Sequence, residues 1–266
     1  MRSKMVDLHY FSGTGNTYLV ARAMAETLRG AGIETELTRI QMALPVSIAP
    51  GTALGLAFPV AYQSTYPFLW RYFRALPAGE GREAFMVDTM GGFSGAIVGR
   101  LKALMLSKGY QPIGACEIRM PVNFWLVDPI KMRHDEVIER GLRKARRYAL
   151  DLAEGRAHWG RIPVLADLAY GIYLSYRWMI FTRWNQRTFR VRNEPERCVS
   201  CGRCAESCPV GNITLDGPTA RIGDRCLGCG TCARVCERGA IEVRIEPGAD
   251  YQRELARRIE AGVDIG

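Results

Sequence analysis

Short apolar runs alternate with amphipathic stretches along the first part of this 266-residue chain. The apolar runs predict buried strands at 5–11, 36–40, 53–58, 84–88 and 113–119. Helical periodicity begins after the first run and ends at Gly30 and Gly32, and further helices are predicted at 67–76, 93–107 and about 135–154. This alternation of strands and helices predicts an α/β fold with a doubly wound parallel sheet.

A turn rich in glycine and hydroxyl groups joins the first predicted strand to the first predicted helix. Its residues are Ser12, Gly13, Thr14, Gly15, Asn16 and Thr17. Free backbone N–H groups and the helix dipole favour a phosphate at such a turn. A Walker loop would need lysine in place of Asn16, and a dinucleotide fingerprint would need glycine in place of Tyr18. The uncharged loop therefore suits a terminal monophosphate, and a glycine turn without ligand is the alternative.

Eight of the nine cysteines fall in two runs near the carboxyl end of the chain. The runs are Cys198, Cys201, Cys204 and Cys208, then Cys226, Cys229, Cys232 and Cys236. Three closely spaced thiolates on one loop, with a fourth arriving from elsewhere, suit a cubane iron–sulfur cluster. Structural zinc, the first alternative, takes its ligands as separated pairs. Disulfides, the second alternative, fit less well because no secretory signal opens the chain, and a cytoplasmic location is expected.

The two runs belong to an internal repeat. Gly211 to Leu215 matches Gly239 to Val243 at the interval that separates the cysteines. Each half predicts a cluster loop, a short helix and a short strand, and two such halves can bury their apolar faces against each other. One difference is that Glu237 follows the last cysteine of the second run where the first run has Pro209. Because charge and hydrogen bonding near sulfur tune cluster potentials, we expect the two clusters to differ in potential.

These motifs carry two resemblances to known families. Residues 191–245 resemble bacterial-type two-cluster ferredoxins, and residues 1–159, with the loop at 12–17, resemble flavodoxins, which hold flavin mononucleotide (FMN) on such a loop. The whole chain resembles flavodoxin–ferredoxin fusion proteins. This resemblance implies a five-stranded flavodoxin-like sheet with FMN, followed by a small α+β domain with two [4Fe-4S] clusters. In that domain the last cysteine of each run serves the other cluster, which gives the ligand sets Cys198, Cys201, Cys204 and Cys236, and Cys226, Cys229, Cys232 and Cys208.

The resemblance also implies that the loops after the third and fourth strands enclose the flavin ring. Their residues are Pro59, Val60, Ala61 and Tyr62, and Thr89, Met90, Gly91 and Gly92. Tyr62 is expected either to stack on the ring or to pack on the surface. Asn123, at the same end of the sheet, either lines the flavin or shapes a turn.

The expected domain organisation has four parts. They are the flavodoxin-like FMN domain at 1–159, an aromatic and basic connector at 160–190, the ferredoxin-like domain at 191–247, and a helix or tail at 248–266. The connector is too apolar for a flexible linker, and charges interrupt it too often for a membrane span. We expect it to pack between the two domains, and the alternative is a helix that docks on a partner or a membrane surface.

The formal charge of +9 suggests nucleic acid at first sight. Cluster-bound thiolates and an FMN phosphate would lower it to about +3, so no nucleic-acid partner is expected. Basic residues still gather at Arg140, Arg143, Lys144, Arg146 and Arg147. This patch is expected to steer an acidic ferredoxin-type partner.

No catalytic residue is predicted. Cys116 lies within a predicted strand and is expected in the core, and the three histidines, His9, His134 and His158, are expected to be structural or solvated. The predicted function is electron transfer between FMN and two clusters, relaying low-potential electrons between a ferredoxin-type donor and a partner. One alternative is a ferredoxin-dependent flavin oxidoreductase that reduces a small acceptor such as a quinone or disulfide. Another is a non-catalytic metal-binding scaffold or sensor, and both a monomer and a homodimer stay open.

Overall fold

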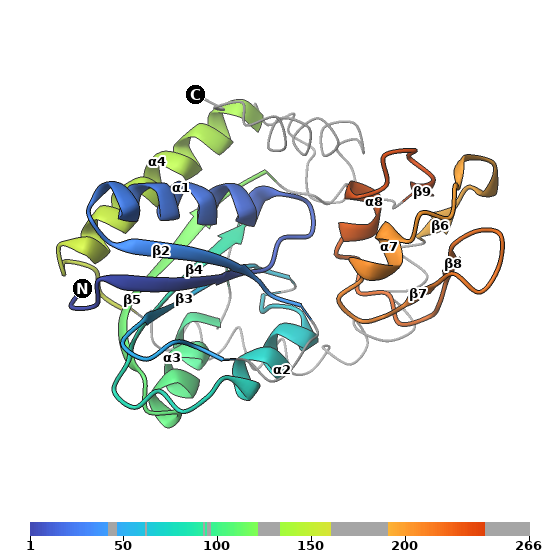
Figure 1. Cartoon of the computed structure of the whole chain (residues 1–266). Coiled ribbons are helices and arrows are strands. Elements are labelled where there is room, and N and C mark those ends of the chain that lie inside the picture. The colour runs from blue at the N-terminus through green and yellow to red at the C-terminus, as the bar shows by residue number, and fades with distance from the viewer. Residues whose placement is uncertain are drawn as a thin grey trace. The chain divides into compact units, whose positions relative to one another are not determined.

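The computed structural model describes residues 1–41, 47–61, 63–92, 94, 97–121, 134–160 and 191–242. The chain forms two compact units, of which the first holds β1–β5 with α1–α4 and the second holds the later elements (Figure 1). Tyr62, Asn123, residues 161–190 of the predicted connector and the predicted tail at 248–266 lie outside the described residues.

The first unit is built on a five-stranded sheet with the strand order β2-β1-β3-β4-β5. Its strands are β1 (Met5–Tyr10), β2 (Glu34–Arg39), β3 (Ala53–Pro59), β4 (Glu83–Met90) and β5 (Gln111–Arg119). All four neighbouring pairs run parallel. This is the strand order of flavodoxin-like doubly wound folds, and it confirms the predicted fold class.

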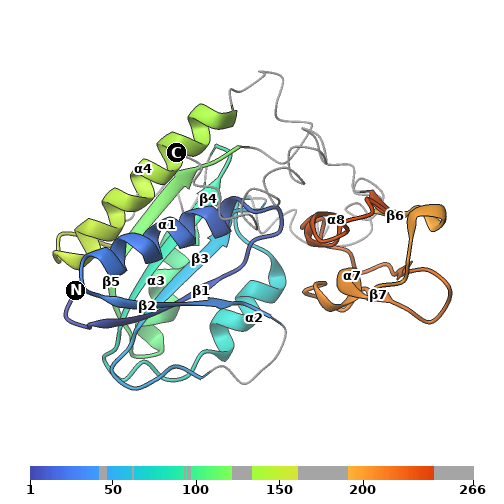
Figure 2. The ribbon, with the colours of Figure 1, turned by 45° about the horizontal axis from the view of Figure 1, so that its top comes forward.

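Helices cover both faces of this sheet. They are α1 (Asn16–Gly30), α2 (Pro67–Ala75), α3 (Ile97–Ser107) and α4 (His134–Ala153). Figures 1 and 2 show α1 and α4 side by side on one face, and α2 and α3 on the other. Both faces of the central strands are therefore buried, which explains why their sequences are continuously apolar rather than alternating.

The central strand β3 shows how closely the sheet packs. Its residues 53–58 are all buried. A Cβ atom at Gly55 would lie 2.6 Å from both Leu8 Cδ1 on β1 and Phe85 Cζ on β4. Large side chains from the two neighbouring strands thus fill the space over Gly55, as expected for an interior packed to crystal-like density.

Strand β5 begins two residues before the predicted start, and it includes Pro112. A proline cannot donate to a ladder, which argues against a central position but is tolerated at an edge. The order of the sheet places β5 at its edge, and its pairing with β4 shifts register directly after Pro112, where Ile113 has no partner in the ladder.

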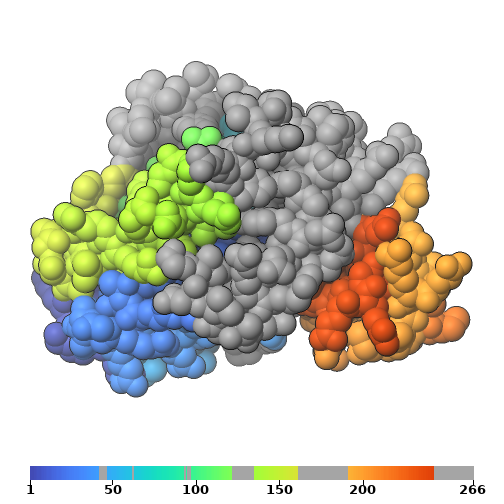
Figure 3. Space-filling view, turned by 90° about the horizontal axis from the view of Figure 1, so that it is seen from above, coloured from blue at the N-terminus to red at the C-terminus, as the bar shows by residue number. Residues whose placement is uncertain are grey.

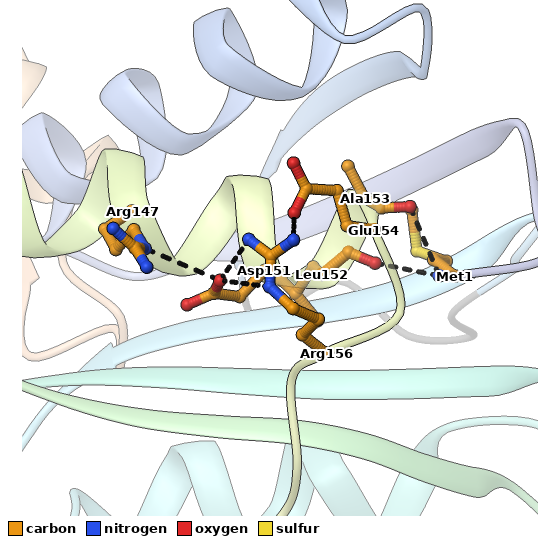
Figure 4. A network of polar contacts seen from close by, with 7 residues as sticks. All are labelled: Met1, Arg147, Asp151, Leu152, Ala153, Glu154 and Arg156. Atoms are coloured by element: carbon orange, nitrogen blue, oxygen red, sulfur yellow. Dashed lines mark hydrogen bonds and ion pairs between the residues drawn. The ribbon is translucent and has the colours of Figure 1, made fainter.

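The chain start and the end of α4 meet in a polar network (Figure 4). The Met1 ammonium group donates to the carbonyl oxygens of Leu152 at 2.8 Å and Ala153 at 3.5 Å. A positive charge here complements the negative end of the helix dipole. The Arg156 guanidinium donates to Asp151 Oδ1 at 2.8 Å and so closes the turn that follows α4.

In residues 191–242, the described part of the second unit, the elements are short. They are β6 (Arg192–Asn193), the 3-10 helix η2 (Pro195–Arg197), α7 (Arg203–Glu206), β7 (Ile213–Thr214), β8 (Arg221–Ile222), α8 (Thr231–Arg234) and β9 (Ile241–Glu242). Strand β6 pairs antiparallel with β9, and β7 pairs antiparallel with β8. Gly202 and Gly230 precede α7 and α8 in the same left-handed conformation, with φ of 82° and 76°. The repeat in the sequence is therefore a repeat in the structure.

No helix in the described ranges is both long enough and apolar enough to cross a membrane.

Candidate cofactor sites

Four cysteines from both runs line a single cavity of about 110 Å³ in the second unit. They are Cys198, Cys201, Cys204 and Cys236. Apolar atoms of Leu215, Ala220 and Ile241 complete the wall. The first three thiols come from one loop and the fourth from the other half of the repeat. Among the described residues, no three His, Cys, Asp or Glu side chains are arranged as ligands of one metal ion.

Strand pairing explains why the fourth thiol comes from the other half. Strand β6, which leads into the first run, pairs with β9, which follows the second run, and Asn193 lies opposite Ile241. Cys198 follows β6 closely and Cys236 closely precedes β9, so the pairing brings both to one place. In the same way β7 pairs with β8, with Ile213 opposite Ile222, and this brings Cys208 towards the second run.

The electrostatics of the thiols follow the same grouping. Burial raises the pKa of Cys204, and the charges of Cys236 and Cys198 raise it further. Burial raises the pKa of Cys226 to about 11, with smaller contributions from Cys229 and Cys208. Burial also raises the pKa of Cys232, to which Cys229, Cys226 and Cys208 add. Thiols that resist ionisation because they are crowded and buried become thiolates when they bind a cation, so both groups fit a cationic iron–sulfur core.

Backbone N–H groups point at several of these sulfurs. Asn212 N–H donates to Cys208 Sγ and Ala240 N–H donates to Cys236 Sγ, both at 3.2 Å and at equivalent places in the repeat. The Ala220 N–H, 3.5 Å from the sulfur, is the first cause of a lowered pKa at Cys198. Donors of this kind stabilise a thiolate and tune the potential of a cluster.

The two halves of the repeat differ in their polar contacts. Glu237, which stands where the first half has Pro209, forms an ion pair with Arg203 from the first cysteine loop. The residue equivalent to Arg203 in the second half is Thr231, which is fully buried. The sequence comparison singled out Glu237 but not its partner Arg203. The two residues are far apart in the chain and meet because each cysteine run packs against the other.

Asn16 and Thr17 begin α1 directly after the glycine-rich turn, and both are buried. Asn16 Nδ2 donates to the Pro121 carbonyl at 3.0 Å, whereas Asn16 Oδ1 is buried and has no hydrogen-bond partner among the described residues. Thr17 Oγ1 lies 2.7 Å from Thr89 Oγ1. The preceding Gly15 has a φ of 117°, which non-glycine residues rarely adopt. The end of the turn predicted to bind phosphate is thus tied to the last residues of β4 and to the loop after β5.

The loops predicted to enclose a flavin meet at the carboxyl edge of the sheet. Val60 N–H donates to the Thr89 carbonyl at 2.8 Å, which joins the loop after β3 to the end of β4. Arg119 Nε donates to the Gly91 carbonyl at 3.1 Å. A Cβ atom at Gly92 would meet no atom within 4 Å, so the chain leaves room there. The expected loop boundaries were wrong in part, because Pro59 ends β3 and Thr89 and Met90 end β4. Val60 and Ala61 follow β3, Gly91 and Gly92 follow β4, and Pro59 lies opposite Thr89 in the parallel ladder.

Asp88 was not anticipated as a site residue. Its carboxyl group is fully buried near the end of β4, and neither oxygen has a hydrogen-bond partner in the part of the chain that the structure describes. Burial raises the pKa of Asp88 well above its ordinary value, and the neighbouring Glu117 raises it further, while Lys144 opposes the shift. The sequence signal for it was available: Asp88 is the one carboxylate in the predicted strand at 84–88, whose other residues are apolar.

His9 and Cys116 are buried, as expected. His9 Nδ1 lies 2.5 Å from the Tyr72 hydroxyl and His9 Nε2 lies 2.6 Å from Asp7 Oδ2, so this histidine holds β1 to α2. Burial raises the pKa of Cys116 to about 12, which keeps the thiol protonated and unreactive.

The basic patch of α4 is largely paired on its own helix. Arg140 contacts Glu136, Arg143 contacts Glu139 and Arg147 contacts Asp151, all one turn apart. Lys144 donates to the Glu117 carbonyl at 2.8 Å. The sequence of α4 holds five basic and four acidic residues. Figure 3 shows residues of α4 at the surface of the molecule. The net charge of this helix is nevertheless small.

Comparisons with known proteins fit the two halves of the chain separately. Residues 197–241 match the model of the 4Fe-4S dicluster domain family. The chain joins a flavodoxin-like fold to a 4Fe-4S domain. Its role is therefore redox, in electron transfer. No curated protein matches the chain.

Solved structures give weaker likenesses. A flavodoxin from the domain Archaea shares 14% identity over 56% of this chain and 96% of its own, with a TM-score of 0.39. Two-electron reduced Megasphaera elsdenii flavodoxin shares 19% sequence identity over 53% of this chain and 99% of its own, with a TM-score of 0.36. A flavo di-iron protein mutant from Thermotoga maritima shares 13% over 57% of this chain and 35% of its own, with a TM-score of 0.41. At these scores the fold assignment depends on the strand order instead.

Proposed function

We propose that the protein transfers electrons between FMN, bound at the carboxyl edge of the sheet, and two [4Fe-4S] clusters held by the second unit. The observation that carries this proposal is the cavity lined by Cys198, Cys201, Cys204 and Cys236. A second set, Cys226, Cys229, Cys232 and Cys208, is supported by strand pairing and by the mutual effects of its thiols. Apolar walls and N–H donors then limit water at the sulfurs and set the potentials.

FMN would be held by the turn at 12–17 and by the loops after β3 and β4. Backbone N–H groups at the start of α1 bind its phosphate, because the helix dipole and free donors favour an anion there. The buried Asn16 Oδ1, which has no partner among the described residues, would be available to accept a hydrogen bond from the bound ligand. The strand order supports this place, since ligands of such sheets bind where the order reverses, between β1 and β3.

Bound FMN supplies chemistry that the clusters lack, because a flavin exchanges one or two electrons whereas each cluster passes one. The chain contributes position and electrostatics. We propose a ferredoxin-type protein as donor of low-potential electrons and a partner protein as acceptor.

The first test is anaerobic purification with quantitation of iron, sulfide and FMN, followed by stepwise optical reduction. We expect about eight irons and one FMN per chain. Asn16→Asp places a negative charge beside the phosphate and should weaken FMN binding by at least about tenfold while iron content stays the same. Colourless protein, or iron without flavin in the parent, would reject the proposal.

A second measurement separates relay from reductase. Reduced ferredoxin is mixed with the loaded protein and with quinones or small disulfides, without a partner protein. A relay reduces the clusters and FMN and then stops, whereas sustained turnover of one acceptor would assign the protein as a ferredoxin-dependent reductase.

A further inference from the structure

The surface around the first-run cavity exposes both apolar and ligand groups. Val199 is 58% exposed and Leu215, which lines the same cavity, is 39% exposed. Cys201, one of the four thiols of the cavity, is itself exposed. A cluster held here would lie close to the molecular surface, and exposed aliphatic side chains beside a site are typical of places where another molecule binds.

Arginines surround this apolar centre. Arg197, Arg203 and Arg238 line the cavity and are exposed, and the one acidic residue among the lining groups, Glu237, is paired with Arg203. We call Arg197, Val199, Arg203, Leu215 and Arg238 the first-run rim. Its three arginines, of which Arg203 is paired with Glu237, surround an apolar middle and offset the negative charge that four thiolates bring to a bound cluster. Arginine is enriched at protein interfaces.

The internal repeat supplies a control for this observation. The residues equivalent to Arg203, Glu237 and Arg238 are Thr231, Pro209 and Val210. The residue equivalent to Arg197 is Arg225, which is also exposed but donates to the Gly211 carbonyl. Thr231 and Pro209 are buried. Exposed arginines at the positions of Arg203 and Arg238 therefore occur around the first cysteine set only, although both sets share the same cysteine spacing.

We infer that the first-run rim is the docking surface for an acidic redox protein, and that the cluster of Cys198, Cys201, Cys204 and Cys236 is the port through which electrons pass. This inference rests on the proposed function. One electron leaves the reduced partner, which is oxidised by one, and reduces this cluster by one; no bond forms and no proton moves. Charge complementarity selects an acidic partner, because opposite potentials speed encounter and fix orientation.

The rim is a better docking surface than the basic patch of α4. The α4 arginines are engaged by acidic residues one turn away, which lowers the potential they project. In the part of the chain that the structure describes, the side chains of Arg197 and Arg238 make no hydrogen bond or ion pair. The rim also lies over the cavity itself, and electron transfer falls steeply with distance between donor and acceptor.

The test compares two charge-reversed variants of the loaded protein. The rim variant is Arg197→Glu/Arg238→Glu, and the matched control on α4 is Arg143→Glu/Arg147→Glu. The probe is a purified acidic two-[4Fe-4S] ferredoxin, used oxidised for equilibrium binding and reduced for stopped-flow transfer. Iron and sulfide content are measured in each variant, and Arg197→Gln/Arg238→Gln replaces the rim variant if its clusters are incomplete.

We expect the rim variant to lose at least about tenfold in binding and in second-order transfer rate at low salt, and to lose most of the salt dependence of the rate. The α4 variant should stay within about twofold of the parent. A rim variant that binds like the parent, or an α4 variant that loses as much, would overturn the docking surface. A parent with full clusters that accepts no electron from the probe would instead reject the proposed function.

Discussion

The sheet unit and the cysteine unit are stabilised by different kinds of core. In the sheet unit the largest fully buried side chains are apolar and come from several elements, among them Phe11, Phe58, Phe73 and Phe85. In the cysteine unit the buried core is Cys204, Ile213, Ala220, Cys232, Ala233 and Ile241. Two of these six residues are predicted ligands, and each strand there has two residues. A unit this small buries too little apolar surface to fold without a further source of stability.

The largest expected difference between the units appears on removal of iron. Chelation of the clusters should unfold residues 191–242, because metal binding supplies the folding free energy that the small core lacks. The sheet unit should keep its structure. Hydrogen exchange followed by mass spectrometry checks this, with β1, β3 and β4 as the internal control. Protection of β6–β9 that survives complete loss of iron would contradict the comparison.

The crossed ligand sets can be tested by pairs of cysteine substitutions. Cys201→Ala/Cys236→Ala removes two ligands of one set and should leave about half of the iron. Cys201→Ala/Cys208→Ala removes one ligand from each set and should lose nearly all of it. Iron analysis with electron paramagnetic resonance reads both variants. The reverse pattern would mean that each run binds its own cluster.

A third prediction concerns packing in the sheet unit. Gly55→Ala places a methyl group 2.6 Å from the side chains of Leu8 and Phe85, so overpacking should cost about 1–3 kcal/mol of unfolding free energy. Gly92→Ala is the matched control, because its methyl group meets no atom within 4 Å. Chemical denaturation of the sheet unit measures both. Equal stability of the two variants would show that β3 is packed less tightly than described.

The last prediction concerns the pH dependence of stability that is linked to Asp88. Its pKa is raised in the folded state, so the stability linked to this group is full below the ordinary value of 3.8 and is lost as pH rises through the folded pKa. Asp88→Asn should remove this loss. We expect the variant to become more stable than the parent above pH 4, by up to about 1.4 kcal/mol per pH unit. The prediction would be contradicted if the unfolding free energies of the variant and the parent changed with pH in the same way.

Much of the sheet unit could be predicted because its signals are local. The apolar runs and the glycine turn before Asn16 gave the strands and the start of α1, and the strand order confirmed the fold class. The start of β5 was missed because Pro112 is unfavourable in a strand except at an edge, and edge position is a property of the sheet. The burial of Asp88 was not predicted for a related reason. It depends on segments distant in sequence, among them β5 and α4, which carry the neighbouring Glu117 and Lys144.

In the cysteine unit the residue types and spacing alone identified eight candidate ligands, because few cofactors need three thiolates on one tight loop. Which four thiols share one cavity depends on the pairing of β6 with β9, residues far apart in the chain. The contrast between the exposed Arg203 and Arg238 at the first-run cavity and the buried Thr231 and the half-buried Val210 at the equivalent positions also appears only in three dimensions. The sequence by itself determines which residue types are present and how they are spaced. Which of them line one cavity or form one exposed surface depends on contacts between segments that are distant in the chain.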